Sequence, residues 1–145
     1  MTTMTTTTVY HNPACTTSRN ALALLRHAGL VPEVIDYLKT PPGKDKLRQL
    51  VRAAGNPLRA LLRESGTPYA ALQLADPHWK DEEVLDFMVA HPILMNRPIV
   101  VTPLGTKLCR PFEAVLEMLP LPKIAGFTKE NGEPVVDNGQ RRAVS

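Results

Sequence analysis

Apolar and polar residues follow two different periods along the chain, and together these periods predict a mixed α/β fold. Residues 7–11 (TTVYH) combine β-branched and aromatic side chains, which is typical of a strand. From residue 16 to about residue 28 the apolar side chains recur three and four positions apart, which predicts a helix that ends before Gly29. The same criteria predict a strand at 31–38, helices at 44–54, 56–66, 67–73 and 80–91, a β-hairpin within 97–111, and a last helix at 111–119.

The predicted order of elements is β-α-β, then a block of three or four helices, then β-β-α. Its first and last parts predict a small mixed sheet flanked by helices, an α/β arrangement of thioredoxin type. No flexible linker flanks the middle helices. We therefore expect a single domain over residues 1–145, with a helical insertion at about 44–91 and a polar, irregular C-terminal tail at about 128–145.

Composition and charge narrow the classes of partner. The 145 residues include 17 Lys and Arg against 14 Asp and Glu, a formal net charge of +3. These basic residues are scattered and aromatic residues are few, so nucleic-acid binding is not expected. No apolar run reaches membrane-spanning length, and the start MTTMTTTTVY lacks the basic and apolar regions of a signal peptide. With two cysteines and no disulfide framework, we expect a cytoplasmic protein without a membrane partner.

Cys15 lies between the first predicted strand and the first predicted helix, and this position favours a reactive thiolate. A helix N-terminus has unpaired backbone N–H groups and the positive end of the helix dipole, which stabilise a thiolate and can bind an oxyanion. The hydroxyl groups of Thr16, Thr17 and Ser18 add donors, and His11 would lower the pKa further if it folds back over the loop. The alternative is a buried structural cysteine.

The redox motif C-x-x-C is incomplete in this chain, because Ser18 occupies its fourth position. Cys109 falls in a strand pattern, so we expect it to be packed in the core; the alternative is a thiol that resolves an oxidised Cys15. The three histidines other than His11 show no metal-ligand spacing with the cysteines, so no metal site is expected.

Three arginines are candidates for binding an oxyanion. Arg63 lies at the end of RALLR, Arg97 in NRPIVV, and Arg110 in LCRP. A guanidinium group offers a planar set of donors that suits such an anion. Each arginine could equally be a solvated surface residue, because the sequence does not show whether the three converge. The Arg97–Pro98 bond lies where thioredoxin-like folds hold a cis bond, and the sequence leaves its isomer open.

Four segments together match one known family: YHNPACTTSRN, RALLR, HPILMNRPIVVTPLGTKLCRP and GFTKENGEPVVD. They closely resemble the glutathione- and glutaredoxin-dependent arsenate reductases of ArsC type, within the thioredoxin superfamily. The resemblance runs from about residue 8 to residue 142. It implies that Cys15 is the catalytic cysteine, that His11 lowers its pKa, and that Ser18 provides a hydroxyl group near the thiolate. It also implies that arsenate and the arsenical intermediates are held by Arg63, Arg97 and Arg110.

The resemblance further implies a reaction with external reductants, for which a single cysteine is enough. Cys15 attacks arsenate, glutathione adds to the arsenic, and glutaredoxin removes that glutathione as the arsenic falls to As(III) and is released as arsenite. Glutathione is then a co-substrate, glutaredoxin a partner, and no tightly bound cofactor is needed. Two other functions remain open, a Spx-like transcriptional regulator and a general glutaredoxin-type thiol oxidoreductase.

One position departs from the family pattern. The family commonly has glycine directly after the catalytic cysteine, where this chain has Thr16. A β-branched residue would be strained there if the position required a positive φ angle, and harmless if it were an ordinary first residue of a helix.

Overall fold

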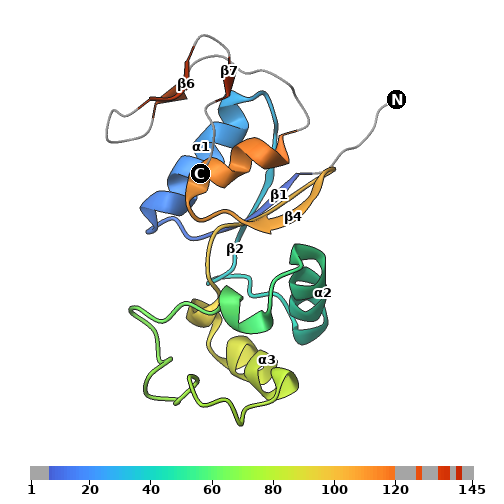
Figure 1. Cartoon of the computed structure of the whole chain (residues 1–145), viewed down its shortest axis with the longest axis vertical. Helices are drawn as coiled ribbons and strands as arrows, with labels where there is room; N and C mark the ends of the chain where they lie inside the picture. Colours follow the sequence, from blue (N-terminus) through green and yellow to red (C-terminus); the bar gives the residue numbers. More distant parts are fainter. Residues whose placement is uncertain (1–6, 120–126, 129–133, 138–139, 142–145) are drawn as a thin grey trace. The chain divides into compact units, whose positions relative to one another are not determined.

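A computed structural model describes residues 7–119 and three short segments of the C-terminal region, 127–128, 134–137 and 140–141. The chain divides into two compact units, one comprising residues 1–35 and 97–145 and the other residues 36–96. Figure 1 labels helices and strands of both units. The single domain expected from the sequence stays a prediction.

The first unit is built on a four-stranded sheet in the order β2-β1-β3-β4. β1 and β3 pair antiparallel with Tyr10 opposite Ile99, and β3 and β4 pair antiparallel with Ile99 opposite Leu108. This arrangement confirms the expected α/β fold with a small mixed sheet and the hairpin predicted within 97–111. The strands are β1 (Thr8–His11), β2 (Glu33–Asp36), β3 (Ile99–Thr102) and β4 (Gly105–Leu108).

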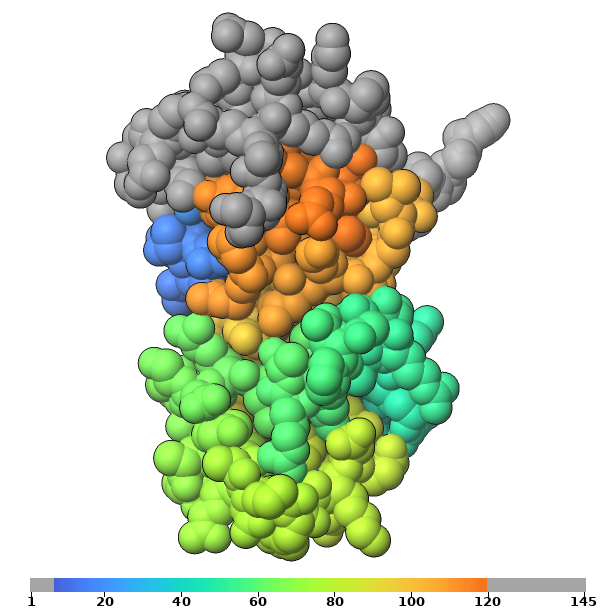
Figure 2. Space-filling view, in the orientation of Figure 1, coloured from blue at the N-terminus to red at the C-terminus, as the bar shows by residue number. Residues whose placement is uncertain are grey.

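Two helices, α1 (Thr16–His27) and η3 (Phe112–Met118), contact each other in the first unit. The predicted apolar stripe of α1 is confirmed, and it packs into one core cluster with β1, β3 and η3. η3 is a 3₁₀ helix at the site of the last predicted helix. In the space-filling view, the orange segment from β4 through η3 forms much of the first unit's visible surface (Figure 2). The largest fully buried side chains of the cluster include Val9, Leu24, Leu25 and Leu116.

The second unit contains α2 (Lys44–Ala54), η1 (Leu58–Leu61), α3 (Asp81–Ala90) and η2 (Pro92–Leu94). The helix predicted at 56–66 is wrong beyond the single turn of η1, and the helix predicted at 67–73 is a series of turns. In the second segment the backbone N–H groups of Leu72, Gln73 and Leu74 donate to carbonyl oxygens four, three and five residues back, and Gln73 has a positive φ angle of 56°. A regular helical ladder therefore does not form there, and the guanidinium of Arg59 donates to carbonyl oxygens of the residues that follow, Leu74, Asp76 and Trp79.

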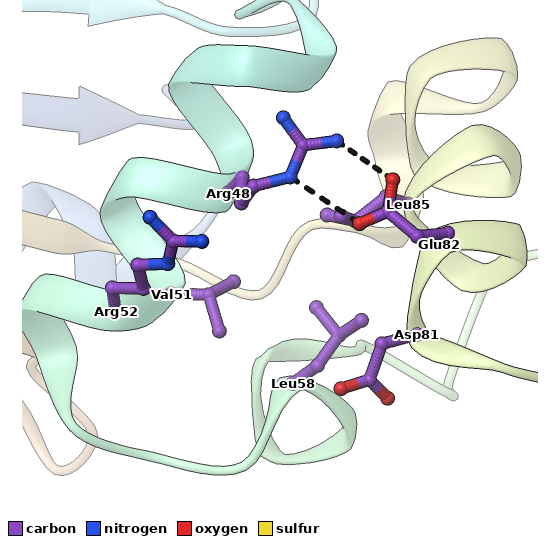
Figure 3. Close-up of a pocket in the computed structure, with 7 residues that line it drawn as sticks. All are labelled: Arg48, Val51, Arg52, Leu58, Asp81, Glu82 and Leu85. Carbon is purple, nitrogen blue, oxygen red and sulfur yellow. Dashed lines mark hydrogen bonds and ion pairs between the residues drawn. The ribbon is translucent and has the colours of Figure 1, made fainter.

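Ion pairs join α2 to α3 across the surface of the second unit. Arg48 donates through Nε and Nη2 to the two carboxylate oxygens of Glu82 at 3.2 and 2.7 Å, and Lys44 Nζ lies 2.8 Å from Asp86. Figure 3 shows the Arg48–Glu82 pair at the edge of a hollow between the two helices. Because exposed pairs contribute little to stability, the helix pair depends mainly on its buried side chains, which include Leu47, Leu50, Val84, Leu85 and Met88.

The C-terminal region contains a three-stranded antiparallel sheet, where the sequence predicted an irregular tail. Its strands are β5 (Phe127–Thr128), β6 (Pro134–Asp137) and β7 (Gln140–Arg141), and that prediction is wrong for these segments. An Asn-Gly pair lies in the sequence between each successive pair of strands. Asn-Gly is a strong hairpin signal, so the sequence did carry the information.

In the part of the chain that the structure describes, no helix combines the length and the apolar character needed to cross a lipid bilayer.

Replacing Leu24 by alanine should destabilise the protein by about 3 kcal/mol, because the side chain is completely buried and its loss leaves a cavity in the core. The free energy of unfolding in denaturant measures the effect. The matched control is Leu104→Ala, the same change at a side chain that is 59% exposed, which should stay within about 0.5 kcal/mol of the parent. Equal losses at the two positions would contradict the assigned core.

Candidate functional site

Cys15 is the N-cap residue of α1, with extended backbone angles of φ −99° and ψ 120°. Its carbonyl oxygen accepts the backbone N–H of Arg19 at 2.9 Å, which is the first hydrogen bond of the helix. Its own N–H donates to the carbonyl oxygen of Asn12 at 3.0 Å, closing a tight turn between β1 and α1. The thiol is partly exposed, at the helix end where backbone N–H groups lack helical partners. This is the strand-to-helix position that the sequence predicted.

Asn12 holds this turn in place, and it was not among the residues predicted from the sequence. Its side chain is buried, and its Oδ1 accepts the backbone N–H of Ala14 at 2.9 Å. Its backbone N–H donates to the Ser18 hydroxyl at 3.1 Å. An Asn whose side-chain oxygen accepts the backbone N–H two residues later forms an Asx turn, and the Asn in HNPAC was the sequence signal for it.

His11 and Ser18 form a buried pair beneath the turn. His11 Nδ1 lies 2.6 Å from Ser18 Oγ, and both side chains are buried. The hydroxyl that the sequence placed near the thiolate thus bonds to the histidine and to the backbone of Asn12. The predicted lowering of the Cys15 pKa by His11 stays a prediction.

Arg110 contacts the candidate nucleophile directly. Its Nη1 donates to Cys15 Sγ at 3.7 Å and to the carbonyl oxygen of Arg97 at 2.8 Å. The second bond fixes the guanidinium in the orientation that reaches the sulfur. The Arg97–Pro98 and Arg110–Pro111 peptide bonds are both cis.

The register of the sheet explains why Arg97 and Arg110 converge. Ile99 pairs with Leu108, so the two arginines each lie two residues beyond the last pair of the β3–β4 hairpin. Tyr10 pairs with Ile99, which brings the turn after β1 to the same end of β3. From the sequence, a hairpin with its turn at residues 103 and 104 would have placed Arg97 opposite Arg110.

The surroundings of Cys15 favour its thiolate. Burial of the thiol acts to raise the pKa of Cys15, but the backbone N–H of Ser18 and the guanidinium groups of Arg110 and Arg97 outweigh burial. The pKa is therefore lowered from its ordinary value. A lowered pKa makes more of the nucleophilic form available near neutral pH.

Cys109 has the opposite environment. It is fully buried in the core cluster, which confirms the expected packing role, and burial raises the pKa of its thiol to about 12. Its sulfur contacts the carbonyl oxygen of Lys107 at 3.7 Å. A thiol with this pKa is protonated and unreactive at neutral pH.

Arg63 belongs to the second unit, so its place beside Cys15 stays a prediction. It follows Leu62, which forms a bridge with Met95, and its backbone N–H donates to Leu94 at 2.7 Å. Its Nε is buried and has no hydrogen-bond partner among the described residues.

Thr16 is the first residue of α1. Among the described residues, the one non-glycine with a positive φ angle is Gln73, so Thr16 is not strained. Its hydroxyl accepts a hydrogen bond from Arg19 Nη2 at 3.1 Å.

The site therefore combines an activated thiol, two guanidinium groups and a helix N-terminus, a set of donors that suits a small anion. Among the described residues, no three His, Cys, Asp or Glu side chains are grouped as metal ligands would be.

Comparisons with known proteins give one consistent result. The sequence model of the ArsC family matches residues 10–118. The chain is 55% identical over 139 residues to an arsenate reductase of Rhizobium meliloti (strain 1021), covering 96% of this chain and 99% of that protein. It is also 55% identical over 135 residues to an arsenate reductase of Escherichia coli, covering 93% and 96%. A solved arsenate reductase from Vibrio cholerae matches with a TM-score of 0.76 at 40% identity, over 81% of this chain and 100% of that one.

Replacing Arg110 by glutamine should raise the pKa of Cys15, because the guanidinium that bonds to the sulfur is lost. The measurement is the pH dependence of thiolate absorbance, together with the rate of alkylation by iodoacetamide. In the parent protein the rate should level off at a lower pH than in the variant, because its thiolate forms earlier as pH rises.

The matched control is Lys107→Gln, which removes a cation from the same hairpin whose contact is with Glu117. It should leave the titration of Cys15 unchanged. A parent midpoint at or above about 8.5, the value of a free cysteine, would contradict the assigned environment.

Proposed function

The chain belongs to the ArsC family, and on that premise we propose that it is an arsenate reductase in which Cys15 is the nucleophile. The observation that carries the proposal is the hydrogen bond from Arg110 to the Cys15 sulfur at the N-terminus of α1. The same donors that stabilise the thiolate can also bind the oxygens of an incoming oxyanion. The thiolate and its substrate would thus share one set of hydrogen-bond donors.

Arsenate is anionic at neutral pH, so its binding must offset the loss of its hydration. Charge-assisted hydrogen bonds from guanidinium groups provide that compensation. Arg97 and Arg110 lie at one end of the β3–β4 hairpin and both lower the pKa of Cys15. We propose Arg63 as a third donor; its buried Nε, which makes no bond among the described residues, supports this role.

In the proposed first step, the Cys15 thiolate attacks the arsenic atom and forms an S–As bond. One arsenate oxygen leaves as hydroxide, or as water once it has gained a proton, and the arsenic remains As(V). The guanidinium groups of Arg97 and Arg110 would stabilise the negative charge on the remaining oxygens. Ser18 contributes its backbone N–H, while its hydroxyl connects this turn to His11.

The two electrons for reduction come from two external thiols. Glutathione displaces a second oxygen and binds to the arsenic. A glutaredoxin thiolate then attacks the sulfur of that glutathione, the S–As electron pair passes to the arsenic, and As(III) results. The mixed disulfide of glutathione and glutaredoxin carries the oxidation away, and water cleaves the Cys15–As bond to release arsenite. The proposed reaction needs no tightly bound cofactor, and we propose the cytoplasm, where both thiols are kept reduced, as its location.

The first test is NADPH oxidation in the presence of glutathione, a glutaredoxin and glutathione reductase, with arsenate added or withheld. Oxidation should depend on arsenate and fall to background in Cys15→Ser, because the attacking thiolate is lost. Absence of arsenate dependence, with the protein folded and Cys15 reduced, would contradict the proposed function and favour a Spx-like or disulfide-exchange role.

Single replacement of Arg97 or Arg110 by glutamine should lower kcat/KM for arsenate by about a hundredfold, the usual effect of removing one donor from an oxyanion site. The rate with a small disulfide substrate should change little when it is measured at a pH where Cys15 is ionised in every variant. Lys107→Gln serves as the control for loss of a cation. Equal losses with arsenate and disulfide would instead indicate a general thiol oxidoreductase.

A further inference from the structure

Arg19 connects the two sides of Cys15. It lies in the first turn of α1, and its guanidinium donates through Nη1 to the carbonyl oxygen of Pro13 at 3.0 Å. Through Nη2 it donates to the Thr16 hydroxyl at 3.1 Å. Pro13 precedes the cysteine in the turn, and Thr16 follows it as the first helical residue. One planar group thus bridges the turn and the helix at the residue that carries the thiol.

We propose that Arg19 is a positioning residue for Cys15, fixing the turn from Asn12 to Cys15 against the first turn of α1. The expected effect of Arg19 on arsenate reduction rests on the proposed function, whereas its effect on the position of the Cys15 sulfur does not. Arg19 would act through the backbone on either side of the cysteine. It thereby sets where the sulfur lies relative to Arg110 and to the backbone N–H of Ser18.

The geometry of the contact with Arg110 explains why a small displacement of the turn would matter. The N–H···S bond is 3.7 Å long and joins residues 95 positions apart in the chain. Arg110 is itself held by the carbonyl oxygen of Arg97, so it is not free to follow a displaced sulfur. Reacting groups that are misplaced by about 1 Å can lose large factors in rate.

The bridge requires a guanidinium and two acceptors. A lysine ammonium on the same side chain is a point donor and does not present the planar fork that reaches two acceptors at once. Replacing Thr16 by valine keeps its shape and removes the hydroxyl acceptor. Asn12 keeps its own contacts with Ala14 and Ser18 in all these variants, so the turn should still form and the protein should fold.

The test compares Arg19→Gln, Arg19→Lys, Thr16→Val and the double variant Arg19→Gln/Thr16→Val. We measure the pKa of Cys15 by thiolate absorbance, its alkylation rate by iodoacetamide, and kcat and KM for arsenate. Both Arg19 variants should raise the pKa of Cys15 and lower kcat by about tenfold with a smaller change in KM. Thr16→Val should give a smaller effect in the same direction, and the double variant should be no worse than Arg19→Gln, because both changes break one bridge.

The matched control is Arg26→Gln, which removes an exposed arginine from the last turn of the same helix. It should leave the pKa of Cys15 and kcat unchanged. An unchanged pKa and kcat in Arg19→Gln would overturn the proposal. So would a lower melting temperature with an unchanged pKa, which indicates a merely structural role, or a raised KM alone, which indicates direct binding of arsenate. Because titration and alkylation need no arsenate, they give a result even if the protein is not an arsenate reductase.

Discussion

The backbone N–H groups at the start of α1 have no partners within the helix, and Cys15 is its N-cap residue, where the N–H of Ser18 lowers the pKa of the thiol. At most helix N-termini a carboxylate or hydroxyl oxygen caps these N–H groups, which stabilises the helix without creating a strong nucleophile. A thiolate is a softer and more reactive anion, so the same electrostatic interaction that stabilises it also prepares a nucleophile. The N–H of Ser18 and the guanidinium groups of Arg97 and Arg110 add to that interaction until it outweighs the cost of partial burial. The chemistry proposed for the protein depends on this balance.

The apolar core determines where these donors lie. Leu24 and Leu25 anchor α1 in the same cluster as Val9 of β1 and Val100 of β3, so the direction of the helix follows from packing rather than from the site itself. Val100 lies on β3, which begins two residues after Arg97, and the antiparallel pairing of β3 with β4 returns the chain to Arg110. The anion-binding groups therefore come from segments far apart in the sequence but are fixed by one sheet register. A shift of that register by one residue would turn side chains to the other face and separate the guanidinium from the sulfur.

Local patterns predicted the parts of this structure that local physics determines. The stripe of apolar residues in α1, the cysteine at its start and the β3–β4 hairpin all follow from spacing within a short segment. The segment after Gly66 is predicted as a helix because Thr67 and Pro68 resemble a helix start, yet its backbone hydrogen bonds are irregular and Gln73 has a positive φ angle, which the spacing of apolar residues does not reveal. In the site, the reactive cysteine was predictable, whereas the orientation of Arg110 toward it depends on the carbonyl oxygen of Arg97.

The contrast between the two cysteines shows why external reductants suit this protein. Cys109 has the same side chain as Cys15 but lies in the apolar core, where burial raises the pKa of its thiol to about 12. Cys15 has a lowered pKa because it lies at a helix N-terminus with a guanidinium on its sulfur. A protein that reduces a substrate by two electrons with a second internal thiol needs that thiol to be ionisable. Cys109 is not, and Ser18 stands where a neighbouring cysteine would complete the C-x-x-C motif. This contrast fits the proposed reaction, in which the electrons come from thiols of other molecules, glutathione and glutaredoxin.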